Sequence, residues 1–443
     1  MNFLLFITIF ILTIIFLLFQ DFDLLAPSSL FNFGFLFSSI FLVLNTKNWG
    51  NISFSTYFII SFGVLIFSSV SLIFNRKKIR QSFNQKISFT TIQISQLKLF
   101  VFLLVQIFLL VIIAKDVISV MKPYGGNGLI SSVGLYGQIA KFNQSVTLKT
   151  IPYNAFVLTT SLGYFFGFIL VNNFLITRKI NSLLATNFMI SLVSSLILGS
   201  RTLFIQIIFS ITIMYLIQYR LLKGNIRIKL MAIIKILTLI GTLGATLIII
   251  GILFERSRAN DIFSYISLYI GAPIKNLDTF LSYRSFIGDR GWINMFAGHY
   301  SNIIGIDVFN TQWQTFLKGT SLNILQVLPF NSVNGVGLGN VYTMFYQLIL
   351  DFGLIGFVIL VILSSLLINY FYINLYKRII KPKNINFFFY LTPALYCYLA
   401  QSILMSFFSN KFIESLNLTL IKTILIWGVM IFLTKQRSIS RLK

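Results

Sequence analysis

Stretches of apolar residues long enough to cross a lipid bilayer recur from one end of this 443-residue sequence to the other. A spanning helix needs about 20 mostly apolar residues, because in lipid every backbone polar group must be satisfied within the segment. By apolar length we expect helices at residues 3–19, 31–45, 55–74, 98–119, 152–176, 181–199, 202–219, 231–254, 342–373, 385–409 and 416–434. The sequence therefore predicts an all-α polytopic membrane protein with about eleven spans.

The composition excludes a water-soluble domain. Apolar residues make up 57% of the chain and charged residues only 10%, which lies far outside the range of soluble globular proteins. Only residues 255–341 form a long polar stretch, so we expect residues 1–443 to fold as a single transmembrane domain in which 255–341 is a long loop. The single Cys397 lies in an apolar run, which excludes an intramolecular disulfide and argues against a thiolate metal cluster. Met1–Phe19 has neither preceding basic residues nor a cleavage site, so we expect it to remain as the first helix.

The formal charge of +25 is distributed in a way that predicts topology. The cations cluster between hydrophobic segments rather than on one basic face, so nucleic acid is not an expected partner. Five acid-free stretches contain Arg76, Lys77, Lys78, Arg80, Lys86 and Lys98; Arg178 and Lys179; Arg220, Lys223, Arg227, Lys229 and Lys235; Lys377, Arg378, Lys381 and Lys383; and Lys435, Arg437, Arg441 and Lys443. Such loops stay cytoplasmic, which predicts a multi-pass protein with all five stretches on the cytoplasmic side.

The same alternation places residues 120–151, 199–201 and 255–341 on the outer face. For the first third of the chain it puts Met1 outside and Asp21 and Asp23 inside, and the orientation of the first two helices stays open. Residues 255–341 contain half of the ten acidic residues and the only histidine. A long loop of this kind is more often functional than not. Within it, residues 262–271 are apolar but too short to span, so we expect short interfacial helices there.

Several cations of the outer face are candidates for binding an anion. Arg201 stands between two apolar runs with almost no loop, so it either snorkels to the headgroups or faces a polar cavity. A pyrophosphate suits such a guanidinium, which binds phosphate oxygens in a bidentate manner and stays charged. Arg256 and Arg258 stand where the preceding helix is expected to reach the outer face. The outer face is therefore the expected location of chemistry.

Two residues of the long loop are candidate general bases. His299 could accept the proton of a sugar hydroxyl near neutral pH. Asp289 is the alternative, because Arg284 and Arg290 are close enough in sequence to lower its pKa. Spacing does not choose between them. The glycines at 335, 337 and 339 lack a surrounding βαβ unit, so we interpret them as a flexible lead-in to the helix near Tyr342, and we assign no metal to the pair Asp21 and Asp23.

Three short motifs resemble those of the Wzy-type O-antigen and capsule repeat-unit polymerases. They are Asp21-Phe22 through Pro27-Ser28, Gly199-Ser200-Arg201-Thr202, and Gly339-Asn340-Val341-Tyr342-Thr343 with Asp351-Phe352-Gly353-Leu354-Ile355-Gly356. The layout is similar too, since these polymerases have about ten to fourteen helices and a large outer loop late in the chain. The resemblance implies an integral-membrane glycosyltransferase of the C class (GT-C), related in fold to the O-antigen ligases, in a bacterial inner membrane with its active site facing the periplasm.

The resemblance implies transfer of a growing glycan from undecaprenyl pyrophosphate to the terminal sugar of a new lipid-linked repeat unit, without metal or other cofactor. Arg201 and Arg258, with Arg256 and Arg290 behind them, would bind the pyrophosphate. His299 or Asp289 would act as base, and Arg284, Asn340 and Tyr342 would contact substrate. The implied partners are the undecaprenyl-pyrophosphate-linked oligosaccharides, membrane lipids and a chain-length regulator.

Two other functions compete with polymerisation. An O-antigen ligase would use the same chemistry but transfer the glycan to lipid A core. A flippase of lipid-linked glycans belongs to a different class, and it would show two related halves with charges near the middle of the membrane. Here the charges gather on a late outer loop, which favours the enzyme.

Overall fold

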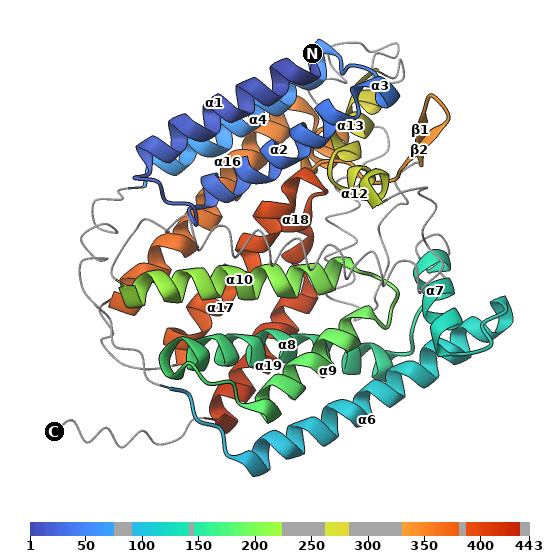
Figure 1. Ribbon diagram of the computed structural model, residues 1–443, viewed down its shortest axis with the longest axis vertical. Helices are drawn as coiled ribbons and strands as arrows, with labels where there is room; N and C mark the ends of the chain where they lie inside the picture. Colours follow the sequence, from blue (N-terminus) through green and yellow to red (C-terminus); the bar gives the residue numbers. More distant parts are fainter. Residues whose placement is uncertain (75–90, 141–145, 224–261, 283–329, 381–386, 435–443) are drawn as a thin grey trace. The chain divides into compact units, whose positions relative to one another are not determined.

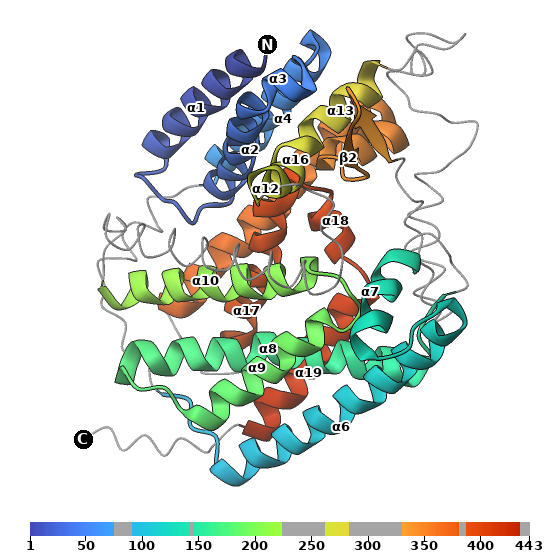
Figure 2. The same ribbon diagram turned by 45° about the vertical axis from the view of Figure 1, so that its right-hand side comes forward.

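The computed structural model describes residues 1–74, 91–140, 146–223, 262–282, 330–380 and 387–434. These residues form helices and one short hairpin (Figures 1 and 2). The expected span at 231–254 lies outside the described residues. By contacts the chain divides into two compact units: unit 1 comprises residues 1–78, 257–373 and 402–417, and unit 2 comprises 79–256, 374–401 and 418–443. Each unit is therefore assembled from segments far apart in sequence.

The described part of unit 1 contains the N-terminal helices together with residues 262–282 and 330–341 of the later polar segment. Its elements are α1 (Asn2–Phe19), α2 (Pro27–Leu44), α3 (Thr46–Trp49), α4 (Phe54–Leu72), α12 (Ile262–Ile270), α13 (Ala272–Ser282), β1 (Asn331–Val333), β2 (Val336–Gly339), the larger part of α16 (Met344–Ile380), the 3-10 turn η4 (Met405–Phe407) and α18 (Lys411–Ser415). Pro27 occupies the first turn of α2, where a missing N–H has no cost. This explains why α2 begins before the expected residue 31.

The described part of unit 2 is a helical bundle around α8. Its elements are α6 (Gln96–Met121), the 3-10 turn η1 (Lys122–Tyr124), α7 (Leu129–Ile139), α8 (Thr150–Thr177), α9 (Ser182–Leu196), α10 (Thr202–Lys223), most of α17 (Phe387–Leu404) and α19 (Leu418–Thr434). Helices α6, α9, α10 and α19 all contact α8. The segment 120–151 thus contains a helix, α7, that apolar length did not predict.

Seven described helices are long and apolar enough to cross a membrane, namely Asn2–Phe19, Pro27–Leu44, Phe54–Leu72, Gln96–Tyr124, Thr150–Thr177, Thr202–Leu222 and Gly353–Leu375. Shorter apolar helices occupy Leu129–Ile139, Ser182–Leu196, Leu391–Phe407 and Leu418–Thr434. The prediction of an all-α membrane protein is confirmed, whereas the count of eleven spans stays a prediction. Gly353 interrupts α16 with φ 65° and ψ −171°, a conformation that glycine adopts most easily.

Phenylalanine rings form the core of unit 1 between α2, α4 and α16. The ring of Phe31 stacks on Phe67 with centroids 4.0 Å apart, and Phe35 stacks on Phe345 at 5.0 Å. Phe357 meets Phe345 edge-on at 5.2 Å. All five side chains are fully buried. Offset and edge-on ring pairs add to the packing energy, so these aromatic residues hold the three helices together.

Buried hydrogen bonds join the turn after α1 to neighbouring helices of unit 1. Gln20 donates to Ser71 of α4 at 3.1 Å and accepts from Ser29 of α2 at 3.0 Å. The carboxylate of Asp23 accepts from the backbone N–H of Leu25 at 3.1 Å and from the hydroxyl of Tyr372 on α16. These contacts fix the turn and give the buried Asp23 a structural role.

In unit 2, too, buried hydrogen bonds of polar side chains join neighbouring helices. Gln106 of α6 donates to Asn187 of α9 at 2.7 Å and accepts from Ser191 at 2.7 Å. Trp427 of α19 donates to the carbonyl oxygen of Ser161 on α8 at 2.9 Å. Polar side chains are costly in lipid unless they are paired. These pairs therefore set which helices pack together.

We expect Gly34→Ala to destabilise the protein. A Cβ at Gly34 of α2 would lie 2.3 Å from the carbonyl oxygen of Leu404 in unit 1, so the backbone must shift at a cost of about 1–3 kcal/mol. Thermal unfolding in detergent measures the loss. Gly337→Ala is the control, since the atoms facing it belong to the Phe330 ring, which can rotate. Equal melting temperatures for the two variants would contradict the prediction.

Candidate functional site

The described residues include three of the predicted site residues. Arg201 belongs to unit 2, whereas Asn340 and Tyr342 belong to unit 1. The other predicted residues, Arg256, Arg258, Arg284, Asp289, Arg290 and His299, lie outside the described residues. The two units are therefore considered separately, beginning with Arg201.

A tight turn in unit 2 fixes the backbone of Arg201 between α9 and α10. Gly199 has φ +62°, and its N–H donates to the carbonyl of Leu196 at 2.8 Å. A Cβ at Gly199 would lie 2.4 Å from the carbonyl oxygen of Val133 on α7. Only glycine fits this position, because both its backbone conformation and the approach of α7 exclude a side chain. The glycine of the second motif thus has a direct steric cause.

Arg201 stands at the N-terminal end of α10. Its carbonyl accepts the first helical hydrogen bond, from the N–H of Ile205 at 3.1 Å, and its side chain is half-buried. A helix N-terminus carries partial positive charge and unpaired N–H groups. The guanidinium of Arg201 therefore adds a permanent positive charge beside the partial positive charge of the helix N-terminus. The turn is therefore suited chemically to a phosphate or pyrophosphate.

In unit 1 the segment before Asn340 is a β-hairpin. Asn331 pairs with Gly339, and Val333 pairs with Val336. The two turn residues, Asn334 and Gly335, have φ 51° and 77°, as the Asn-Gly turns of two-residue hairpins require. The prediction of a flexible lead-in to the helix was wrong. The Asn-Gly pair between Val333 and Val336 is the sequence signal that could have revealed the hairpin.

Asn276 of α13 holds the end of this hairpin and the residues that follow it. Its side-chain amide donates to the carbonyl oxygen of Val341 at 2.8 Å, and its Oδ1 accepts from the side chain of Asn331 at 2.9 Å. Asn276 is completely buried. Because both ends of the carboxamide are used, α13 holds the backbone directly after Asn340 and the side chain of Asn331 in the first strand of the hairpin. The half-buried Asn340 is thus presented by a rigid segment.

Tyr342 lies in an aromatic cluster rather than on the surface. Its ring centroid is 4.3 Å from that of Tyr346, which meets Phe280 of α13 edge-on at 4.4 Å. The position of the ring favours a supporting role beside Asn340. Its predicted contact with substrate stays a prediction.

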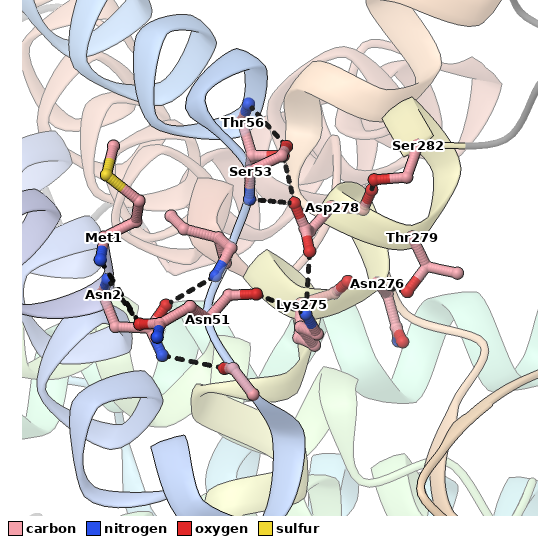
Figure 3. A network of polar contacts seen from close by, with 12 residues as sticks. Met1, Asn2, Asn51, Ser53, Thr56, Lys275, Asn276, Asp278, Thr279 and Ser282 are labelled. Atoms are coloured by element: carbon pink, nitrogen blue, oxygen red, sulfur yellow. Dashed lines mark hydrogen bonds and ion pairs between the residues drawn. The ribbon is translucent and has the colours of Figure 1, made fainter.

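A buried ion pair anchors α13 to the start of α4 (Figure 3). Lys275 Nζ lies 2.8 Å from Asp278 Oδ2 and donates to the carbonyl oxygen of Asn51 at 2.9 Å. The other carboxylate oxygen of Asp278 accepts from the N–H of Ser53 at 2.7 Å and from the hydroxyl of Thr56 at 2.8 Å. Both charges are nearly enclosed, so each needs the other and these additional hydrogen bonds.

The first residues of α1 join the same network, as Figure 3 shows. Asn2 accepts from the N–H of Ile52 at 2.9 Å and donates to the carbonyl of Gly50 at 3.0 Å. The loop between α3 and α4 is therefore bound on one side by α1 and on the other by α13. This network positions α13, which in turn positions the segment of Asn340.

Sequence reasoning did not single out Asn276. A buried asparagine in a short amphipathic helix has no local signature, since its partners are 55 and 65 residues away. Lys275 and Asp278 belong to the long loop and were not predicted to pair, although their spacing of three residues is typical of a pair on one helix face. Within the described ranges, no group of three His, Cys, Asp or Glu side chains could hold a metal ion.

Comparisons with family models, with curated proteins and with solved structures found no match to this chain.

We expect Asn276→Ala to loosen the segment that carries Asn340. The substitution leaves the Val341 carbonyl and the Asn331 amide without their partner, at a cost of about 1–3 kcal/mol. Hydrogen–deuterium exchange of residues 336–342 should rise. Thr279→Ala on the same helix is the control, because it removes only a bond within α13 to Lys275. Unchanged exchange in Asn276→Ala would show that the contact does not fix the segment.

We expect the folded protein to lose stability at low pH because of Asp278. Burial alone would raise the pKa of this carboxyl, but hydrogen bonds from Lys275 and Ser53 hold it below the ordinary value of 3.8. As pH falls, the unfolded chain therefore takes up the proton first. The stabilising contribution is complete above pH 3.8 and is lost as pH falls through the folded-state pKa.

Asp278→Asn should reduce this loss below pH 3.8, measured as the melting temperature in detergent. At neutral pH the variant should be less stable by about 3 kcal/mol, because Lys275 is left buried without its counter-charge. Asp21→Asn, at an exposed position in the same unit, should behave as wild type. An identical pH profile for Asp278→Asn and wild type would refute the role of this carboxylate.

Proposed function

We propose that the protein polymerises undecaprenyl-pyrophosphate-linked oligosaccharide repeat units at the periplasmic face of a bacterial inner membrane. The observation that carries the proposal is the position of Arg201, which a glycine turn holds at the N-terminus of α10 between two apolar helices. The Arg201 and Asn340 motifs support it as well. With the span expected at residues 231–254, the protein would have about eleven spans and a GT-C-like fold.

The proposed reaction forms one glycosidic bond and breaks the bond between the anomeric carbon of the growing glycan and an oxygen of its pyrophosphate. The hydroxyl oxygen of the acceptor's terminal sugar attacks the anomeric carbon of the growing glycan. His299 or Asp289 takes the hydroxyl proton, and undecaprenyl pyrophosphate leaves with the bonding electron pair. Negative charge therefore develops on the leaving group, where fixed cations lower the energy of the transition state.

The residues have distinct proposed tasks. Arg201 and Arg258, supported by Arg256 and Arg290, bind the pyrophosphate, and Arg284, Asn340 and Tyr342 contact the sugars. The rigid attachment of the Asn340 segment to α13 supports such a role, since a substrate contact must be held in place to orient the acceptor. A chain-length regulator is the protein partner that this function implies.

Reconstitution with synthetic undecaprenyl pyrophosphate oligosaccharides tests the proposal. We expect Arg201→Ala and Arg258→Ala to reduce polymerisation by about 100-fold or more, because each removes a charge that stabilises the leaving group. Lys122→Ala removes an exposed cation from the segment predicted to face the same side and should keep normal activity. Elongation by folded Arg201→Ala at the wild-type rate would overturn the proposal.

The same assay separates the two transfer reactions. A polymerase produces ladders of repeat units on the lipid carrier. A ligase produces no such ladder and transfers glycan only when lipid A core is supplied. Transfer to lipid A core without elongation would replace polymerisation by ligation as the function.

A further inference from the structure

A crevice in unit 2 opens where α6 and α9 begin and α8 nears its end. Its volume is about 330 Å³, which is in the range of small-ligand sites. The apolar side chains of Leu99, Ile169 and Leu184 line it together with the polar side chains of Ser95, Asn173 and Asn181. The three apolar residues are buried. The crevice is thus amphipathic, and neither the sequence motifs nor the proposed reaction uses it.

Hydrogen bonds hold the polar wall of the crevice in place. The side chain of Asn173 accepts from the N–H of Ile92 at 2.9 Å and donates to the carbonyl of the same residue at 2.8 Å. The segment before α6 is therefore fixed to α8 by a pair of bonds like those between strands. The site is preformed, so a ligand need not order it.

The crevice offers donors and positive potential but no acid. Ser95 and Asn181 cap the N-termini of α6 and α9, so two helix ends with partial positive charge border the same space. No aspartate or glutamate is among its lining residues. Lys98 stands in the first turn of α6, and Arg178 and Lys179 lie between the C-terminal end of α8 and the start of α9. An anionic group is the complementary ligand.

The surroundings of the crevice distinguish a lipid from a free anion. Leu97 of α6 and Ile180 before α9 are 73% and 63% exposed, and Phe100 is also exposed. These large apolar side chains flank the polar wall at the ends of membrane helices. A ligand in the crevice would contact both hydrogen-bond donors and exposed apolar side chains. These match the phosphate headgroup and the acyl chains of a phospholipid.

We propose that this crevice binds the headgroup of an anionic phospholipid, with the acyl chains along the exposed apolar faces of α6 and α9. The helix ends that form it carry two of the Lys- and Arg-rich stretches, which stay cytoplasmic. The lipid therefore belongs to the cytoplasmic leaflet, where anionic lipids attract basic segments. This site is separate from the chemistry proposed for the outer face.

A single side chain provides the test, because Asp and Ser both replace Asn as helix N-caps. Asn181→Asp keeps the cap of α9 and adds a negative charge to the crevice, whereas Asn181→Ser keeps the cap without charge. Native mass spectrometry of the full-length protein in detergent, titrated with phosphatidylglycerol, measures lipid binding. We expect Asn181→Asp to bind about tenfold more weakly than Asn181→Ser, and wild type to prefer phosphatidylglycerol over phosphatidylcholine.

Each other outcome overturns the proposal. Equal binding by the two variants places the lipid elsewhere, and equal binding of the two lipids by wild type removes the anion requirement. Soluble glycerol phosphate is the third arm. If it raises the melting temperature as much as phosphatidylglycerol, the ligand is a free phosphate. If the Asn181 variants do not fold, Ser95→Asp and Ser95→Thr provide the same comparison at the cap of α6.

Discussion

Hydrogen bonds between polar side chains inside the apolar bundle are the interaction on which both units depend. In lipid, apolar helix faces gain little from leaving the solvent, so association relies on close packing and polar contacts. Ser68 bonds Asn32 across α4 and α2, and Ser365 of α16 bonds the carbonyl of Phe67. Gln106 serves the same purpose in unit 2. The Ser, Asn and Gln residues within the apolar runs thus specify the packing.

The helices were largely predictable, because lipid imposes one length and one secondary structure on each apolar run. Residues 3–19 and 98–119 were expected, and the helices occupy Asn2–Phe19 and Gln96–Met121. Of the elements that do not follow this length rule, a short helix was expected at 262–271 and α12 occupies Ile262–Ile270, but two others were missed. Helix α7 is too short to span, and the hairpin depends on the local chemistry of Asn334 and Gly335 rather than on hydrophobicity.

The candidate site was predictable only where the chemistry of a single residue type makes its position unusual. Arg201 is conspicuous because a cation between apolar runs is expensive, and Gly199 before it is required by a close backbone approach. Asn276 is not conspicuous, because its role arises only when α13 meets the hairpin. Contacts between segments that are distant in sequence leave no pattern in either segment alone. The chemistry of a single residue can therefore be predicted from the sequence, whereas the long-range contacts that hold that residue in place cannot.

The two proposed anion sites differ in how they carry positive charge, and the difference follows from their tasks. A pyrophosphate that leaves during a reaction gains charge in the transition state, so a permanent guanidinium such as that of Arg201 is the effective partner. A resident lipid headgroup gains no charge. Amide donors and helix N-termini, as at Asn181 and Ser95, hold it without a strong charge that would trap it. On these two proposals, the net charge of +25 is divided between basic loops that set topology and attract anionic lipid and a fixed cation, Arg201, that serves chemistry.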